Sequence, residues 1–323
     1  MMSTEGKRDA GRIMTVLGPI EVEQMGVTLP HEHVLVDFIG AEQVSRDRYD
    51  ADIAMQVILP HLEQVQKLGV QTFVDCTPAY IGQDPVLLKK LAETTGLYML
   101  TNTGYYGGRD GIFLPAHAFR ETADQLAERW ANDWLNGIED TGIRPGFIKI
   151  GINPTGTLSG MDRKLVHAAA RAHLKTGLTI AAHTVTGPVL EELEILREEG
   201  VDPNAFIWVH ANGDPDMRRH VAVAELGAWV EFDGVSEAVE ADVRRLVNMK
   251  AHGLLAHVLL SHDAGWYEPG KPDKAFRGYN CLFERLIPAL KKNGFTAAEI
   301  EQLVVLNPAN AFAIGVKSLP KGA

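Results

Sequence analysis

Short apolar stretches rich in β-branched residues alternate with amphipathic segments along most of this chain. The stretches predict strands at Thr28–Phe38, Thr72–Thr77, Tyr98–Tyr106, Phe147–Ile152, Leu178–Thr184, Phe206–Ala211, Ala228–Asp233 and His257–Asp263. The segments between them predict helices that include Asp84–Thr95, Phe119–Ile138, Asp162–Thr176, Val189–Glu199, Asp214–Leu226, Ala238–Lys250 and Tyr279–Lys292. A small hairpin over residues 13–22, turning at Gly18-Pro19, precedes the first strand.

This alternation indicates a parallel sheet covered by helices, in the α/β class. Eight strand–helix units in 323 residues favour a closed (β/α)8 TIM barrel with a short N-terminal β-hairpin. An open doubly wound sheet is the alternative, although no Gly-x-Gly-x-x-Gly follows an early strand. We expect a disordered lead-in over 1–12, a single domain over 13–316 and a C-terminal tail over 317–323.

Composition and charge narrow the class of protein. Hydrophobic residues make up 46% and charged residues 23%, as in ordinary soluble domains. The formal net charge of −11 argues against a nucleic-acid partner or an anionic membrane. No apolar run has transmembrane length, and the first ten residues lack the apolar core of a signal peptide. With only Cys76 and Cys281, which give no disulfide framework, we expect a cytoplasmic protein.

The first predicted strand begins with two histidines. His31 and His33 are two residues apart, so both side chains point to one face of a strand and Glu32 points to the other. Two imidazoles on one face form half of a metal site. The alternative is that they are two ordinary polar residues at the end of a strand. The residues of the other predicted strands distinguish the two explanations.

Polar side chains recur at the ends of the other predicted strands, where a barrel of this kind has its active site. Lys149 lies inside the apolar fourth strand, His183 and His210 end the fifth and sixth, and Asp263 ends the eighth. Each has an ordinary structural explanation: a lysine that extends out of the barrel wall, core histidines, or a helix-capping aspartate. Their joint occurrence at strand ends favours one functional site.

These residue types suit a pair of divalent metal ions. Four neutral imidazoles and one carboxylate are donors for borderline ions such as zinc. Two cations close together repel each other, so a bridging anion is needed. Burial disfavours the charged form of a lysine, and a neutral Lys149 amine can add carbon dioxide to give a bridging carbamate.

Four stretches together make the chain resemble the phosphotriesterase family of the amidohydrolase superfamily, from Thr15 to about Phe312. These stretches are Gly26–His33, Gly69–Asp75, Arg144–Lys149 and Asn307-Pro308. The family comprises binuclear metal (β/α)8 barrels, among them phosphotriesterases and lactonases. The resemblance therefore implies the same fold and a metal-dependent hydrolase.

The resemblance also implies a ligand for each position of a two-metal site. The ligands of the more buried ion would be His31, His33 and Asp263, and those of the more exposed ion His183 and His210. Carbamylated Lys149 would bridge the two ions. Zinc is the expected metal, with manganese, cobalt or iron as alternatives, and a homodimer is the assembly that the family implies.

Three further residues are candidate substrate contacts. Tyr106 aligns with an aromatic position beside the metals in the family, although it could equally be a plain strand-end aromatic. Asp214 is the acidic residue nearest to the sixth strand end and the candidate proton relay. It departs from the family pattern, in which acidic residues often follow the histidine directly. Trp266 lies in the loop-like segment 265–278, a candidate binding loop. The seventh strand end also lacks an arginine that some lactonases have.

The expected function is hydrolysis of a small-molecule ester, with Asp263 accepting the proton of the attacking water. By resemblance, lactones or related carboxylic esters come first, with promiscuous hydrolysis of organophosphate triesters. Three alternatives remain open: a mononuclear deaminase, a Schiff-base aldolase using Lys149, and a non-catalytic binding barrel. The lysine in the fourth strand argues against the deaminase, and the surplus of histidines argues against the aldolase. The filled ligand positions argue against the non-catalytic barrel.

Overall fold

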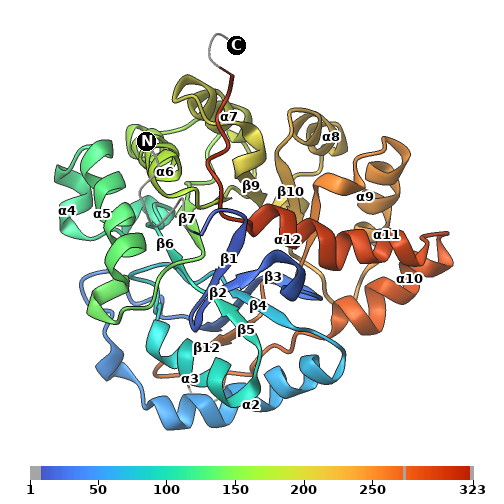
Figure 1. The fold of residues 1–323 in the computed structure, drawn as a ribbon, viewed down its shortest axis with the longest axis horizontal. Coiled ribbons are helices and arrows are strands. Elements are labelled where there is room, and N and C mark those ends of the chain that lie inside the picture. The colour runs from blue at the N-terminus through green and yellow to red at the C-terminus, as the bar shows by residue number, and fades with distance from the viewer. Residues whose placement is uncertain (1–8, 272–273, 321–323) are drawn as a thin grey trace.

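The computed structural model, which describes residues 9–271 and 274–320, is the predicted barrel with helices around its strands (Figure 1). The barrel strands are β3 (Thr28–Leu35), β4 (Thr72–Asp75), β5 (Tyr98–Leu100), β6 (Asn102–Thr103), β7 (Phe147–Gly151), β8 (Ile180–His183), β9 (Phe206–Val209), β10 (Trp229–Phe232) and β11 (Val258–Leu260). The single strand predicted at Tyr98–Tyr106 is β5 and β6, which share one barrel position across Thr101. The α/β class with parallel strands is confirmed.

Neighbouring barrel strands run parallel in two arcs. One arc has the order β11-β10-β9-β8-β7-β6, and the other β12-β3-β4-β5, where β12 is Gly265–Tyr267. The arcs meet where the first and last strands are adjacent. There the Asp263 N–H donates to the His31 carbonyl at 3.1 Å and the His33 N–H to the Ala264 carbonyl at 3.0 Å. Because the strands are parallel, their carboxyl ends gather at one end of the barrel.

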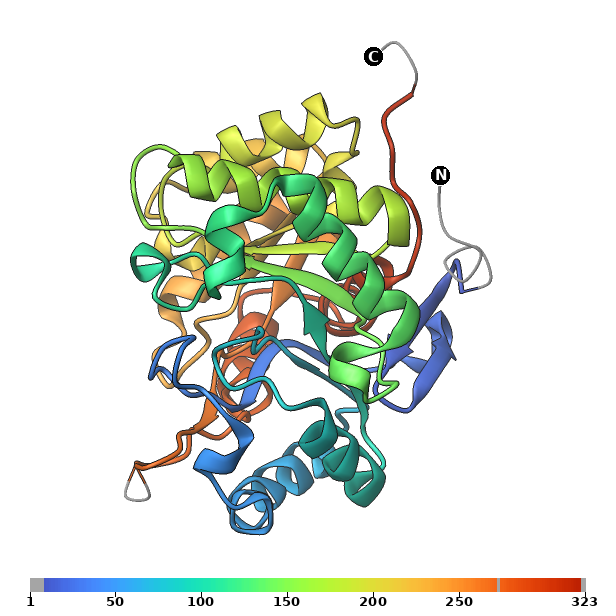
Figure 2. The same ribbon diagram turned by 90° about the vertical axis from the view of Figure 1, so that its left-hand side faces the viewer.

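The helices form the outer layer, seen from the side in Figure 2. They are α2 (Ala51–Lys67), α3 (Pro85–Thr95), α4 (Ala116–Arg120), α5 (Ala123–Asn136), α6 (Gly160–Thr176), α7 (Val189–Glu198), α8 (Met217–Glu225), α9 (Glu240–Ala251), α10 (Ile287–Lys292), α11 (Ala297–Glu301) and α12 (Asn307–Phe312). Each predicted helical segment contains a helix. Within the described residues, no helix is both long and apolar enough to cross a membrane.

Two helical regions differ from the sequence-based expectation. The segment 119–138 is divided because α4 ends at Arg120 and Thr122 caps the start of α5, its side chain accepting from the Gln125 N–H. Helix α2 was not predicted, although Ala54, Ile58 and Leu62 form its buried stripe, because Pro60 interrupts an otherwise helical pattern.

The amino-terminal end of the barrel is closed by apolar side chains. The predicted hairpin is present as β1 (Arg12–Thr15) and β2 (Gly18–Glu21), and it contributes Ile13 to a cluster inside the barrel. Phe312 of α12 joins the same cluster, with its ring centroid 5.4 Å from that of Phe147. A packed end of this kind leaves the opposite, carboxyl end of the strands for a functional site.

Residues of the expected lead-in and of the expected tail contact the folded domain. Residues 1–8 of the expected lead-in and 321–323 of the expected tail lie outside the described residues. Asp9 is buried and pairs with Arg144 at 2.8 Å, and β1 starts at Arg12. The Lys317 N–H donates to His173 Nε2 at 3.0 Å, which attaches the described part of the tail to the helix layer.

Candidate metal centre

One cavity of about 140 Å³ at the carboxyl end of the barrel gathers the predicted metal ligands. The predicted ligands that line it are His31, His33, Lys149, His183, His210 and Asp263. His31, His33, Lys149 and His183 lie in strands, His210 directly follows β9, and Asp263 comes three residues after the end of β11. His210 and Asp263 leave their strands with positive φ angles of 63° and 49°. Such backbone is uncommon for residues other than glycine and is frequent at functional sites.

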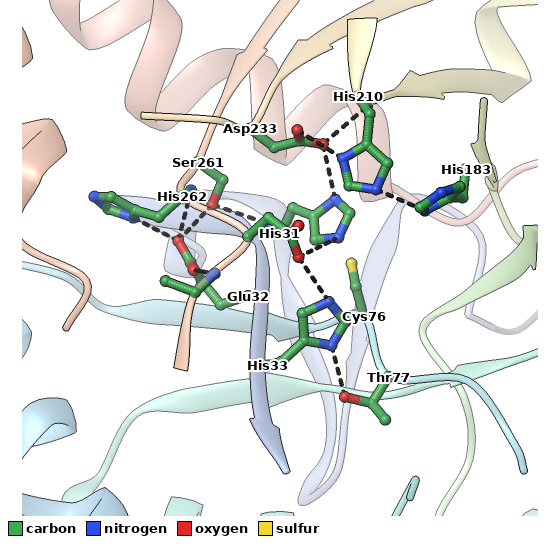
Figure 3. A network of polar contacts seen from close by, with 12 residues as sticks. His31, Glu32, His33, Cys76, Thr77, His183, His210, Asp233, Ser261 and His262 are labelled. Atoms are coloured by element: carbon green, nitrogen blue, oxygen red, sulfur yellow. Dashed lines mark hydrogen bonds and ion pairs between the residues drawn. The ribbon is translucent and has the colours of Figure 1, made fainter. Parts of the chain in front are cut away.

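The first ligand group, of which Figure 3 labels His31 and His33, connects the first strand of the barrel to the residues after the last one. Asp263 Oδ1 lies 3.0 Å from His33 Nε2 and 3.7 Å from His31 Nε2. Ligand atoms of these three residues lie within 4.8 Å of one another, close enough to hold one ion. The His33 ring is fixed from behind, because its Nδ1 lies 2.7 Å from the Thr77 hydroxyl.

A second group of potential ligands contains an aspartate that the sequence did not single out. The carboxylate of Asp233 lies 2.8 Å from His210 Nδ1 and 3.1 Å from His31 Nδ1, and it also accepts from the His210 N–H at 2.9 Å. These three residues form the other possible metal cluster among the described residues. Carboxylates at Nδ1 orient imidazoles and leave the Nε2 atoms toward the cavity, which is the usual arrangement behind metal-binding histidines.

His183 completes a chain of ring contacts across the cavity. Its Nδ1 lies 2.6 Å from His210 Nε2, and its Nε2 lies 2.9 Å from the Tyr106 hydroxyl. If His210 donates from Nδ1 to Asp233, then His210 Nε2 accepts from His183 Nδ1 and the tyrosine donates to His183 Nε2. His183 Nδ1 and His210 Nε2, which share one proton here, are the two nitrogens that a divalent ion would bind.

Lys149 provides the test of whether this pocket fits a two-metal site. Its side chain is 2% exposed, and its Nζ has no hydrogen-bond partner within the described residues. A buried ammonium with no partner is costly, and histidines on several sides do not compensate its charge. As a carbamate it would be an anion among four imidazoles, with oxygens for two ions. The residues therefore fit a pair of divalent ions.

Burial keeps the site histidines neutral and ready to bind metal. It lowers the pKa of His31 to about 3, with the nearby Lys149 charge adding to the effect. Burial also lowers the pKa of His183 well below its ordinary value, with further contributions from His210 and Lys149. Because only the neutral imidazole offers a lone pair, these shifts favour metal coordination at neutral pH.

The carboxylates of the site have contrasting protonation. Burial alone would raise the pKa of Asp263, but the hydrogen bond and charge of His33 outweigh it and lower that pKa. The pKa of Asp233 is likewise lowered against burial, through His210. The pKa of Glu231 is raised well above its usual range by burial and by the charge of Asp233. These directions favour the ionised forms of Asp263 and Asp233 and the protonated form of Glu231.

The candidate substrate contacts divide into two that line the cavity and one that does not. Tyr106 and Trp266 both line it, although Trp266 lies on β12 and not in an irregular loop as expected. Asp214 lies elsewhere: it is buried, pairs with Arg219 and accepts from the Asp216 N–H. Asp214 follows the 3-10 turn Ala211–Gly213 after His210 and is not among the residues that line the cavity, so its role as a proton relay stays a prediction.

Sequence reasoning also overlooked several polar residues of this site. Glu231 and Asp233 alternate with Val230 and Phe232, so the same period of two that identified Lys149 places both inside the barrel. Arg109 lines the cavity from a 3-10 turn after β6. Its position depends on loop conformation, for which the sequence gives no periodic signal.

Comparisons with known proteins identify the family of the chain. The model of the phosphotriesterase family matches residues 11–312. An aryldialkylphosphatase from Saccharolobus solfataricus is 30% identical over 311 residues, covering 91% of this chain and 97% of the relative. The solved organophosphorus hydrolase from Deinococcus radiodurans has a TM-score of 0.84 at 26% identity, covering 94% of this chain and 97% of that one.

A second solved structure comes from the engineering of organophosphate hydrolysis activity from a weak promiscuous lactonase template. It has a TM-score of 0.84 at 26% identity and covers 94% of this chain and 100% of its own. The family match, the fold and the histidine-rich site lead to one conclusion: the chain belongs to the phosphotriesterase family.

Proposed function

We propose that this protein is a binuclear metal-dependent hydrolase of carboxylic esters, with lactones as the preferred substrates and organophosphate triesters as slower ones. The observation that carries the proposal is Lys149, a buried amine without a partner among the described residues, beside four histidines and two ionised aspartates. Similarity to a lactonase-derived enzyme and to an aryldialkylphosphatase supports the ester class.

The residues that would hold one ion are His31, His33 and Asp263, and those for the other are His183 and His210. The Lys149 amine would add carbon dioxide, forming one N–C bond and releasing one proton, and the resulting carbamate would be shared by both ions. When bound, two such ions lower the pKa of water and polarise the oxygen of the scissile group. Asp233 would hold the ring of His210 in place by accepting from its Nδ1. It also lies 3.1 Å from the Nδ1 of His31, whose hydrogen-bond partner is Glu231 at 2.9 Å.

Asp263 is the proton acceptor of this proposal. Its side chain is 25% exposed, whereas that of His31 beside it is 1% exposed, so Asp263 connects the cavity to solvent. Its lowered pKa leaves the carboxylate free to accept the proton of the attacking water. The geometry keeps this carboxylate at the ligand cluster, since Asp263 Oδ1 lies 3.0 Å from His33 Nε2.

The remaining cavity walls suit a small apolar acyl or alkyl group. Val36, Ile81 and Phe113 are buried there, and Phe38 packs against Trp266 with ring centroids 5.7 Å apart. Burial raises the pKa of Tyr106 to about 12, so its hydroxyl keeps a proton to donate beside the reacting group. A volume of about 140 Å³ favours a compact ring such as a lactone over a bulky triester.

The experiment is a substrate screen on metal-loaded protein, using γ- and δ-lactones, aryl esters and a phosphotriester. We expect lactones to have the highest kcat/KM, and a chelator to abolish every activity. Preference for the phosphotriester would reverse the proposed order of substrates.

The aldolase alternative is tested on the same preparation. We expect no covalent trapping when borohydride is added with a carbonyl substrate, because Lys149 would not form a Schiff base. Activity that survives chelation and is lost to borohydride would replace the hydrolase proposal with an aldolase.

A further inference from the structure

The metal cavity adjoins a second, outer cavity at three shared residues. Phe38, Arg109 and Trp266 line both the inner cavity of about 140 Å³ and an outer one of about 520 Å³. A substrate that reaches the metal ligands from the outer cavity passes these side chains. We call Phe38, Arg109 and Trp266 the doorway.

The outer cavity is more cationic than the chain as a whole. Four cationic side chains line it, Arg48, Arg109, Lys271 and Lys274, against two anionic ones, Asp37 and Glu268. This excess of positive charge occurs on a protein with a formal net charge of −11. A local field of the opposite sign to the net charge selects for ligands of negative charge.

Most of these cations are already paired. Arg48 donates to Asp37 at 2.5 Å, and Glu268 accepts from Lys274 at 2.7 Å and from Lys271. Arg109 differs, since it forms no salt bridge with any carboxylate in residues 9–271 and 274–320. It is therefore the cation of the doorway that remains available to a ligand.

The guanidinium of Arg109 is nevertheless held in position. Its Cζ lies 5.3 Å from the ring centroid of Phe38 and 5.8 Å from that of Phe113. Stacking on aromatic faces leaves the in-plane N–H donors of arginine free. The next residue anchors the backbone, because the Asp110 N–H donates to Asn153 Oδ1 at 3.0 Å.

We propose that Arg109 selects ester substrates that carry an anionic group, such as a carboxylate, at the end remote from the scissile bond. The small apolar inner cavity would take the ester ring, and the guanidinium at the doorway would bind the anion through paired N–H donors. This inference rests on the proposed hydrolase function and names its substrate class.

The test compares two lactones that differ only in charge: a γ-butyrolactone bearing a ring carboxylate and the carboxamide of the same ring. Metal-loaded wild type should prefer the carboxylate. Arg109→Gln should lower kcat/KM for the carboxylate roughly tenfold to a hundredfold and leave the carboxamide within about twofold. Arg120→Gln, the same charge change at an exposed residue of α4, should alter neither.

A binding measurement separates failure of this inference from failure of the proposed function. Cyclopentanecarboxylate should bind wild type more tightly than cyclopentanecarboxamide by calorimetry, and Arg109→Gln should remove most of the difference. A carboxylate bound only by metal ions would bind both proteins equally, which would overturn the role of Arg109. If neither lactone is hydrolysed but the binding difference holds, the hydrolase proposal fails and the anion preference stands.

Discussion

At the scale of single residues, the polar side chains of the site differ in how clearly the sequence predicts their positions. Lys149 could be predicted because one polar residue in an apolar strand is conspicuous, and the strand period places it inside the barrel. Asp233 could have been predicted in the same way, because the strand period of β10 also places it inside the barrel. Arg109 could not be predicted, because a positive φ of 53° in a short turn determines where it lies.

Substitution of Lys149 tests the bridging role. Lys149→Ala should lose metal and activity together, because no anion remains between the two ions. Added acetate or propionate with excess metal should restore part of the activity. Lys149→Arg is the control, since arginine keeps the charge, forms no carbamate and should not be rescued. Full activity of Lys149→Ala without additive would rule out the carbamate.

Substitution of Asp263 separates proton acceptance from metal binding. Asp263→Asn should retain the fold and part of the metal, but lower kcat roughly 100-fold to 10,000-fold because an amide accepts no proton. Metal analysis of the same sample shows whether the loss follows the ions instead. Near wild-type turnover in this variant would remove Asp263 as the base.

At the scale of elements, buried carboxylates connect strands to one another and to helices. Glu32 points away from His31 and His33, and it joins the first strand to the last (Figure 3). It accepts from Ser261 Oγ at 2.8 Å and from His262 Nδ1 at 2.6 Å, and the backbone N–H groups of His262 and Ala264 donate to it at 3.0 and 2.9 Å. This network fixes the strand ends on which the ligand geometry depends.

The link between β8 and α7 is sensitive to pH. Burial raises the pKa of Glu192 to about 8 from an ordinary 4.5, and its carboxyl contacts the Thr184 hydroxyl at 2.7 Å. Because the folded state favours the protonated form, this stabilisation is complete below pH 4.5 and is lost as pH rises toward about 8. Glu192→Gln should flatten the pH dependence of unfolding by about 1.4 kcal/mol per pH unit in that window.

Chemical denaturation at several pH values measures this slope for both proteins. Glu194→Gln, an exposed change on the same helix, is the matched control and should keep the wild-type slope. Parallel curves for wild type and Glu192→Gln would mean that Glu192 is ionised in the folded protein.

At the scale of the whole molecule, the alternation of strands and helices was sufficient to predict the barrel. Buried strands that are apolar on both faces leave few other folds, and the parallel direction brings His31 and Lys149 to one end from distant positions in the chain. Segments whose structure depends on contacts with distant parts of the chain were harder to predict. β12 was expected to be a loop because Gly265 and Pro269 mark turns, and its strand forms by pairing with β3, which is distant in the sequence.

The most direct test of the two-metal account is the metal content of purified protein, measured by elemental analysis after expression with zinc or manganese. Wild type should carry about two ions per chain, and a chelator should remove the ions and the hydrolase activity in parallel. A well-folded wild type that never exceeds one ion per chain, yet is fully active, would contradict the binuclear site and favour a mononuclear enzyme.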